Sequence, residues 1–401
     1  MKPYFLLMAA ALYACSSNDE PESGGTEINL EPQEIECVKT QSSFAFKFFK
    51  EAMAQSIEPN LIVSPLSASM CMSLIANGAA GDTQQEILTA LGFGESELKA
   101  LNRCNSKLAQ QLPDVDRKTK ISLANSIWLD NAISAKTDFI NVMSENYSAE
   151  FYTENLSSDA AMFKINRWAS DKTSGMIPQF LDEPLKDTRI ALINALYFKS
   201  EWAEKFDRKN TTERVFHSST GEQNSIPMMK GNVAVRAAHD SNGAGWVRIG
   251  YGNGRFAMIL ILPDENVSLG EYLASIDNST FSEMTSFMKS YEGTIVLPKF
   301  DISCKTELKD VMKALGIVKA FGDADFSPLS EDMARIDRIL QKTHITVNEE
   351  GAEIAAVTGS GLTMLPEPAE TAEFIFDHPF AFIVHERSSD TILFMGCINK
   401  L

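Results

Sequence analysis

The histidines of this 401-residue chain are the side chains with the widest range of possible chemistry, from proton transfer to zinc binding. They occur singly, and none falls in an HExxH motif or in a pair with the spacing of zinc ligands. His385 precedes Glu386 in a predicted strand, and we interpret these two residues as an exposed strand end. The histidines therefore indicate neither a hydrolase nor a metal centre. Their positions are His217, His239, His344, His378 and His385.

The other motifs that could carry catalysis are incomplete. The segment TGSGL resembles the turn that presents a nucleophilic serine, but Thr358 stands where the G-x-S-x-G motif requires its first glycine. Asp264 and Glu265 are neighbours in a strand pattern, where successive side chains point to opposite faces. The phosphate-binding pattern GxxxxGK does not occur. We therefore expect no enzymatic activity and no cofactor.

The cysteines do not form a metal-binding pattern, because no two of them have CxxC spacing. Cys71 lies in an apolar segment, where a free thiol behaves as a small hydrophobic group. We interpret the cysteines mainly as buried thiols, and one disulfide remains open. The six positions are Cys15, Cys37, Cys71, Cys104, Cys304 and Cys397.

Composition limits the partners and the number of domains. The formal net charge is -18, and so acidic a surface repels phosphate backbones, so nucleic acid is not an expected partner. A hydrophobic fraction of 44% suffices for a sizeable core. No linker or internal repeat interrupts the chain after Cys37. We expect one domain over residues 37–401, and a monomer.

The N-terminus has the pattern of an export signal. The apolar run Phe5 to Ala14 is too short to span a bilayer as a helix, so residues 1–14 are predicted to be a signal peptide. The stretch LYAC resembles the lipobox of bacterial lipoproteins, which would make Cys15 a lipidation site; an ordinary signal peptide cleaved just before Cys15 is the alternative. Residues 15–36 are rich in Ser, Pro, Gly and Glu and predict a flexible acidic tether.

The expected location follows from this N-terminus. The segment CSSNDEPE resembles surface-export signals of Bacteroidetes lipoproteins. We expect an exported lipoprotein of the outer membrane or cell surface, held to the membrane only through its lipid. A periplasmic or secreted protein is the alternative.

Helical patterns dominate the first half of the chain and strand patterns the second. An apolar stripe predicts a helix over Phe44 to Gln55. The segment Ser64 to Ala79 is apolar almost all round, which predicts a buried helix. A third helix is predicted after Lys305, with Gly316 as its stop. The near-continuous apolar run Thr188 to Lys199 is typical of a strand covered on both faces. This order of elements indicates an α+β domain with large mixed sheets.

A long stretch near the C-terminus has nothing large to bury. Alternation continues from Val347 to Thr358, so that two sets of side chains would lie on opposite faces of a strand. The set that begins at Ala352 consists mostly of small residues and could slide over an existing core. No proline occurs in residues 349–365, so every backbone N–H there could join a strand ladder. The segment could thus become a central strand; a loosely packed surface loop is the alternative. The two sets are Ala352, Ile354, Ala356 and Thr358, and Glu353, Ala355 and Val357.

Several motifs, in the same order along the chain, resemble the serpin family. EEGAEIAAVTG resembles the hinge of the serpin reactive loop, and FIFDHPFAFIV resembles the signature after that loop. NLIVSPLSASM, INRWASDKTSGMIPQFL, LINALYFKSEWAEKFD and LPKFDIS resemble further family segments. The matches run from about Ser43 to Leu401, nearly the whole predicted mature chain.

The resemblance implies three β-sheets, eight or nine helices and an exposed reactive loop, here about residues 349–373. It further implies a suicide-substrate inhibitor of serine proteases, with cysteine proteases as a second target class. The cleaved loop would insert into the main sheet and trap the acyl-enzyme. A non-inhibitory serpin, acting as a binding protein or as a protease substrate, is the alternative.

The same resemblance assigns roles to particular residues. Lys299 matches the usual ion partner of the hinge acid Glu349, and Trp202 the tryptophan near the point of insertion. Ser64, Ser67 and Asn194 match a polar cluster beneath the sheet. Gln341 stands where the family often has histidine, and it can still donate and accept hydrogen bonds. The expected hinge is Glu349, Glu350, Gly351, Ala352, Glu353, Ile354, Ala355, Ala356, Val357 and Thr358.

Two features of the loop bear on how it would work. Ile354 is larger than the alanine that the family prefers, and overpacking during insertion would make the protein partly a substrate. Family spacing points to Leu365 as the residue before the cut, but Pro366 follows it and suits few serine proteases. We therefore predict cleavage at Met364–Leu365, with Leu365–Pro366 and Thr363–Met364 as alternatives. An apolar residue before the cut suits elastase-like or chymotrypsin-like pockets.

Overall fold

The computed structural model describes residues 25–147, 149–264, 266–351 and 370–401. These residues form nine α-helices and fourteen strands, which makes the fold α+β as expected. The helices are α1 (Pro32–Gln55), α2 (Pro65–Ala76), α3 (Gly81–Leu91), α4 (Leu98–Gln111), α5 (Thr137–Tyr147), α6 (Asp159–Lys172), α7 (Leu269–Ser275), α8 (Asn278–Phe287) and α9 (Lys309–Ala314). The strands are β1 (Leu61–Val63), β2 (Lys120–Asp130), β3 (Glu150–Glu154), β4 (Ile190–Lys199), β5 (Thr212–His217), β6 (Gln223–His239), β7 (Gly245–Tyr251), β8 (Phe256–Leu262), β9 (Lys289–Pro298), β10 (Phe300–Glu307), β11 (Arg338–Val347), β12 (Glu370–Ile375), β13 (Phe380–Glu386) and β14 (Thr391–Ile398).

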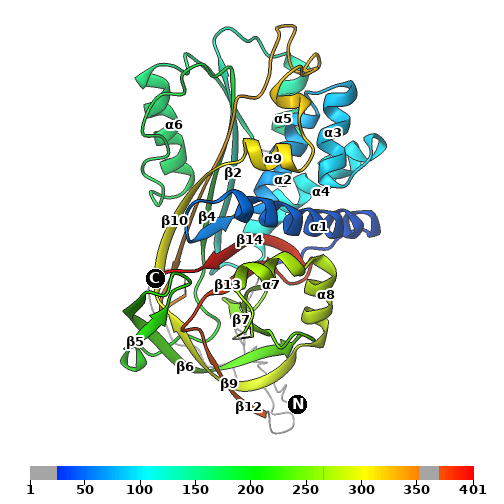
Figure 1. The fold of residues 1–401 in the computed structure, drawn as a ribbon. Helices are drawn as coiled ribbons and strands as arrows, with labels where there is room; N and C mark the ends of the chain where they lie inside the picture. Colours follow the sequence, from blue (N-terminus) through cyan, green and yellow to red (C-terminus); the bar gives the residue numbers. More distant parts are fainter. Residues whose placement is uncertain (1–24, 148, 265, 352–369) are drawn as a thin grey trace, which may run out of the picture.

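A five-stranded sheet occupies one half of the molecule, with the order β10-β11-β4-β2-β3 (Figure 1). Its central strands, β11 and β4, are parallel and are directly hydrogen-bonded from the pair Arg338–Ala191 to the pair His344–Tyr197. Helix α6 covers one face, over a buried cluster that includes Trp128 and Trp168. Helix α2, which is buried throughout, packs against the other face. The apolar run of β4 is therefore covered on both sides, as its sequence predicts.

The second sheet has nine strands and contains the regions that the expected fold divides into two sheets. Its order is β1-β14-β13-β8-β7-β6-β9-β12, and β5 pairs with β6 beside this path. The 17-residue strand β6 is long enough to pair with β9 on one edge and with both β5 and β7 on the other. It thus joins a small sheet, β5-β6-β9-β12, to a larger one that lies beneath α1, α7 and α8 (Figure 1).

The N-terminal boundary of the folded domain differs from the expected one. The tether predicted to reach residue 36 ends earlier, because α1 begins at Pro32 and Ile28 before it is only 4% exposed. Glu34 accepts a hydrogen bond from the backbone N–H of Glu31 at 2.8 Å, and proline suits the first turn of a helix. These local signals start the helix inside a segment whose overall composition is that of a tether.

His385 and Glu386 are also placed differently from the expectation of an exposed strand end, since both are fully buried in β13. The ring of His385 meets Phe281 of α8 edge-on, and neither ring nitrogen has a hydrogen-bond partner. Burial, with Arg248 and Arg387 nearby, lowers the pKa of His385 to about 3, and the Asp390 carboxylate lies 4.0 Å from its Nδ1. The histidine is therefore neutral in the folded protein.

His385→Leu should stabilise the protein by about 1–2 kcal/mol, because it removes a buried polar ring without partners. The gain should grow below pH 6.5, where the unfolded histidine takes up a proton that the folded one, with its lowered pKa, does not. Denaturant unfolding at pH 7.5 and pH 5.5 measures both effects. His217→Gln, at an exposed histidine, is the control. A variant less stable than the parent at both pH values would contradict this expectation.

Candidate functional site

A tight turn at the end of β11 forms the edge of the candidate site. The backbone groups of Asn348 and Gly351 hydrogen-bond to each other, at 3.0 and 3.1 Å, and the side-chain oxygen of Asn348 accepts from the N–H of Glu350 at 2.9 Å. The alternation expected to run on from Val347 therefore stops, and the chain reverses direction. Gly351 makes an antiparallel bridge with Glu201, just beyond the end of β4.

The segment after β4 holds this turn from one side. The indole N–H of Trp202 donates to the carbonyl of Asn348 at 2.9 Å, and its backbone N–H donates to the carbonyl of Glu350 at 2.9 Å. The indole itself stacks on Tyr251 of β7, with ring centroids 4.4 Å apart. Trp202 thus fixes the turn to both sheets, which supports the position that the sequence assigns to it beside the hinge.

Glu349 is the buried acid of the turn, with a side chain that is 6% exposed. Lys299 lies 2.9 Å from its carboxylate, and the hydroxyl of Thr211 donates to it at 2.7 Å. Burial opposes ionisation, but the hydrogen bonds from Lys299 and Thr211 outweigh it, so the pKa of Glu349 lies below its ordinary value. Thr211 was missed by the sequence analysis, since nothing in its local sequence marks it as a partner.

Glu350 faces a more open set of charges on the other side of the turn. Lys205 lies 2.8 Å from Glu350 and 3.3 Å from Glu201, and Arg208 lies 3.4 Å from Glu350. Burial disfavours the charge on Lys205, but its hydrogen bonds to the two carboxylates raise its pKa. The Glu350 side chain is 20% exposed and that of Glu349 only 6%, so water weakens the pairs of Glu350 more and Glu349 is the stronger attachment.

A polar cluster lies at the middle of the β11–β4 pair, where Gln341 and Asn194 are direct neighbours in register. The amide of Gln341 accepts from the backbone N–H of Ser64 at 2.8 Å and donates to its carbonyl at 3.1 Å. Asn194 donates to Asn125 of β2 at 2.6 Å, and Ser67 donates to the same oxygen at 3.1 Å. The structure therefore brings together the four residues that the sequence placed in this cluster.

The cluster ties the two central strands to different neighbours. Gln341 anchors β11 to the start of α2, where the hydroxyl of Ser64 also accepts from the N–H of Ser67 at 3.3 Å. Asn194 anchors β4 to β2 instead, and its side-chain oxygen has no partner. Asn125 was missed by the sequence analysis, although a polar residue in a largely apolar strand could have drawn attention to it.

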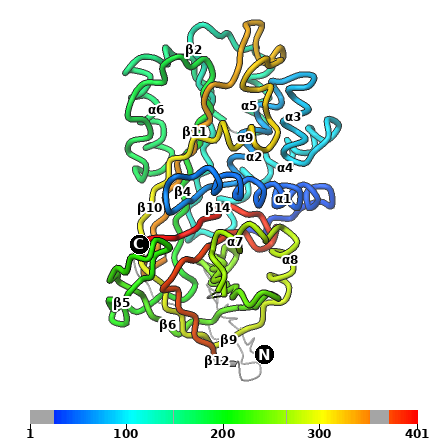
Figure 2. Tube along the Cα trace, viewed as in Figure 1, coloured from blue at the N-terminus to red at the C-terminus, as the bar shows by residue number. Residues whose placement is uncertain are grey.

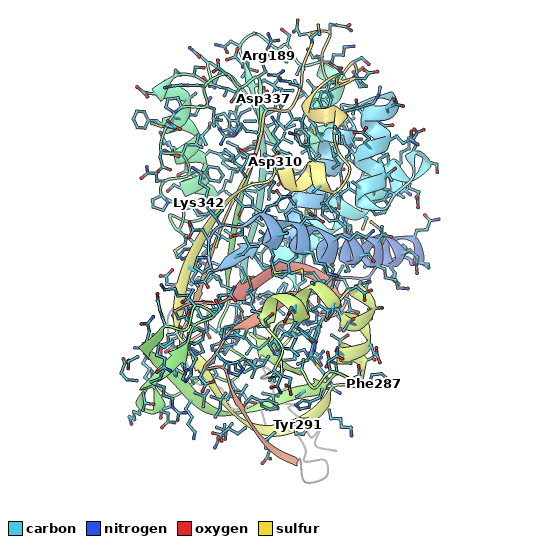
Figure 3. The ribbon with its side chains drawn as sticks, viewed as in Figure 1. Arg189, Phe287, Tyr291, Asp310, Asp337 and Lys342 are labelled. Carbon is cyan, nitrogen blue, oxygen red and sulfur yellow. The ribbon has the colours of Figure 1, made fainter. Side chains whose placement is uncertain are left out.

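Hydrogen bonds also hold β11 and β4 together at the end of the pair where both strands begin. The backbone N–H of Arg189 donates to the Asp337 carboxylate at 2.8 Å, and the N–H of Asp337 donates to the carbonyl of Ile190 at 3.0 Å. In Figure 3 Arg189 and Asp337 lie at the end of the sheet away from β12, and Lys342 lies part-way along β11. The trace in Figure 2 shows the same course of β11 beside β4. The central pair is thus continuous from one end to the other.

Comparison with known proteins explains this arrangement. A family model described as serpin (serine protease inhibitor) matches residues 39–401. The chain belongs to the serpin family. Serpins in general inhibit proteases and are not catalytic enzymes. Similar proteins include an uncharacterized serpin-like protein of Methanosarcina mazei, with 30% identity over 91% of this chain and 87% of that protein. A serine protease inhibitor of Cyanea capillata is 32% identical over 89% of this chain and 96% of its own length.

Solved serpin structures have the same fold. The native state of tengpin, a thermophilic serpin, matches with a TM-score of 0.84 and 26% identity, over 94% of this chain and 96% of tengpin. Human thyroxine-binding globulin in complex with thyroxine also matches with a TM-score of 0.84, over 92% of this chain and 99% of that protein. Its identity is 23%, so this match shows the fold alone.

Some residues assigned from the sequence lie outside the part of this serpin that the structure describes. They are Cys15, the second part of the hinge (Ala352, Glu353, Ile354, Ala355, Ala356, Val357 and Thr358) and the residues of the candidate cleavage sites (Thr363, Met364, Leu365 and Pro366). Within the described residues, no three His, Cys, Asp or Glu side chains are grouped to hold a metal ion. None of the described helices combines the length and apolarity needed to cross a membrane.

Lys299→Ala should destabilise the uncleaved serpin by about 1–3 kcal/mol, because the buried Glu349 carboxylate loses its cation. The lowered pKa of Glu349 means that its contribution is present above pH 4.5 and is lost as the pH falls through the folded-state pKa. Denaturant unfolding at pH 7 and pH 4 of the single variants and of Lys299→Ala with Glu349→Gln measures this coupling. Lys313→Ala, at an exposed ion pair, is the control and should cost less than 1 kcal/mol. Equal losses at the two lysines would contradict the assignment.

Proposed function

We propose that this serpin inhibits serine proteases as a suicide substrate, by inserting its cleaved reactive loop between β11 and β4. The observation that carries this proposal is the direct parallel pairing of these two strands at the centre of the sheet. The turn at residues 348–351 reverses the chain, so a strand that follows it runs antiparallel to both neighbours. Insertion would replace one parallel ladder by two antiparallel ladders, which are the more stable kind per residue.

Gly351 forms an antiparallel bridge with Glu201, directly beyond β4, and this is the pairing direction that the residues after Gly351 would have beside β4. Their entry requires the β11–β4 hydrogen bonds to open, together with the contacts of Glu349 and Gln341 that hold β11 in place. The proposed function of these residues is therefore to hold the sheet closed until cleavage releases the loop.

The chemistry belongs to the target protease. Its serine hydroxyl attacks the carbonyl carbon of Met364, an ester to that carbonyl forms, and the chain beginning at Leu365 leaves with a new amino group. At about 3.3 Å per residue, the stretch from Glu349 to Met364 can carry the attached protease roughly 50 Å along the sheet. Distortion of the protease's own catalytic groups then prevents hydrolysis of the ester.

The proposed targets have elastase-like or chymotrypsin-like specificity, because Met364 is apolar and offers no positive charge to a trypsin-like pocket. Cysteine proteases form a similar acyl-enzyme and are a second target class. The chain itself has no cofactor in this mechanism, and it acts as a monomer.

A non-inhibitory role is the second candidate function, and one observation favours it. Ile354 would enter the sheet on a face that is closely packed, since Leu192 and Leu196 of β4 are fully buried there. A branched side chain without room would slow insertion and leave time for the acyl-enzyme to hydrolyse. The fold is also that of thyroxine-binding globulin, a protein that binds a small ligand.

One experiment separates these functions. The protein is mixed with elastase-like, chymotrypsin-like and trypsin-like serine proteases, and covalent complexes are sought on a denaturing gel. Each protease with its active-site serine already blocked is the control. We expect a complex with the first two classes, and mass spectrometry of the released fragment should find Leu365 at its N-terminus. Cleavage of the loop without any stable complex would favour the non-inhibitory role.

We further propose that Cys15 carries lipid and anchors the protein at the outer membrane or cell surface. Growth with a palmitate analogue should label the wild type and not Cys15→Ser, because the diacylglyceryl group that carries the fatty acids is attached through the Cys15 sulfur. Cys37→Ser is the control and should be labelled like the wild type, since Cys37 is buried in the folded domain. Equal labelling of Cys15→Ser, or an unlabelled wild type released into the medium, would refute lipidation.

A further inference from the structure

Two cysteines from separate helices meet in the core. Cys37 of α1 is 4% exposed and Cys104 of α4 is fully buried, and their thiol groups are neighbours in the core. The thiol of Cys104 also approaches the carbonyl of Glu34, one turn before Cys37, at 3.9 Å. Both cysteines are free in the structure.

The helices around this contact are held in fixed register by two further interactions. Lys107 of α4 lies 2.6 Å from the Glu34 carboxylate, and the side chain of Gln41 donates to that of Asn105 at 2.6 Å. One interaction lies on each side of Cys37 along α1. The packing of α1 against α4 therefore places the two thiols as neighbours.

We propose that Cys37 and Cys104 form a disulfide when the chain folds in an oxidising compartment. The occurrence of this bond in cells rests on the proposed export of the protein, whereas its formation in solution does not. Among the other described cysteines, Cys71 lies beside Asn194. Cys304 and Cys397 lie near each other beside β1, but each thiol has a partner of its own: the Asn60 carbonyl at 3.8 Å for Cys304, and the Asn399 side-chain amide at 3.7 Å for Cys397.

The reaction needs an external oxidant, such as oxidised glutathione or a protein disulfide carrier. The Cys37 thiolate attacks one sulfur of the oxidant's disulfide and displaces a thiolate. The Cys104 thiolate then attacks the sulfur attached to Cys37, which forms the Cys37–Cys104 bond and releases the second thiolate. Both cysteines lose their protons, and the oxidant gains two electrons and becomes two thiols.

Burial of the two thiols in the folded protein limits the stage at which an oxidant can react with them. The neighbouring Cys104 thiol and then burial raise the pKa of the Cys37 thiol well above its ordinary value, so the folded, reduced protein holds little thiolate there. Oxidant should therefore form the bond during folding, when both thiols are exposed, and only slowly afterwards. The bond would join the beginning of α1 to α4 and restrict the unfolded chain between them.

The test uses the full chain, refolded from denaturant with a mixture of reduced and oxidised glutathione, alkylated and digested. Mass spectrometry should find one linked peptide pair, containing Cys37 and Cys104. Reduction should then lower the midpoint of thermal unfolding by roughly 5 °C. The native reduced protein treated with the same buffer should acquire the link at least tenfold more slowly.

Matched variants identify the pair without relying on a single mutant. Cys104→Ala should lose the link and its response to reductant, and Cys71→Ala, at a second buried cysteine, should keep both. If either variant fails to fold, the peptide map of the wild type still decides the question. Free thiols at both Cys37 and Cys104 after oxidative refolding, or a link that uses another cysteine, would overturn the proposal.

Discussion

Ala356→Arg should abolish the trapping of proteases while leaving the reactive loop cleavable. Ala356 shares a face with Ala352, Ile354 and Thr358, the face that would turn toward the core on insertion. At the destination, Leu192 and Leu196 are fully buried on the side of the sheet that α2 covers. An arginine there would be an unpaired buried charge, which costs more than insertion can supply. The acyl-enzyme would then hydrolyse.

Counting the inhibitor molecules consumed for each protease trapped measures this effect. We expect the covalent complex to fall below detection and the cleaved protein to accumulate at the wild-type rate. The matched control is Glu353→Arg, which puts the same side chain on the opposite face, at a position that already carries a charge. That variant should still trap protease. A full yield of complex with Ala356→Arg would contradict insertion as the mechanism.

Gly351→Ala should have the largest effect on the closed sheet of any substitution in the hinge turn. Gly351 has φ of +121°, and a Cβ added there would lie 2.4 Å from the Ser200 carbonyl and 2.5 Å from the Trp202 nitrogen. Both atoms are backbone atoms that cannot rotate away. We expect the turn to be expelled, with a loss of about 3 kcal/mol or more from strain and overpacking.

The functional result should follow from the same displacement. Once the turn leaves its place, Trp202 and Lys299 lose their partners in residues 348–350, and the loop is free to enter the sheet without cleavage. Incubation at 37 °C followed by titration with protease should show faster loss of inhibitory capacity than in the wild type. Gly175→Ala is the control, because Gly175 has φ of +83° and open space around it. Equal stability losses for the two variants would show that the close contact at Gly351 is not the cause.

Local sequence patterns predicted several helices and strands of this protein. The apolar run of β4 predicted a strand covered on both faces, because such a strand has no face for water. Gly316 predicted the end of α9, since its φ of +101° is a conformation that glycine adopts without strain. Each of these two signals lies within a few residues of the feature that it predicts. The central strand predicted after Gly351 lies outside the described residues and stays a prediction.

The tertiary structure decided which distant residues meet. Glu349 contacts Lys299 and Thr211 only because the end of β11, the start of β10 and the start of β5 lie together in the fold. Cys37 and Cys104 likewise meet only through the packing of α1 on α4.

The pattern of a strand gives the two faces of its side chains but not what covers each face. The sequence analysis therefore missed the burial of His385, which depends on α8 lying over β13. It also extended the strand alternation through residues 348–351, which Trp202 holds in a turn. These features depend on contacts between segments far apart in the chain, and the free energy of such contacts does not appear in local propensity or periodicity.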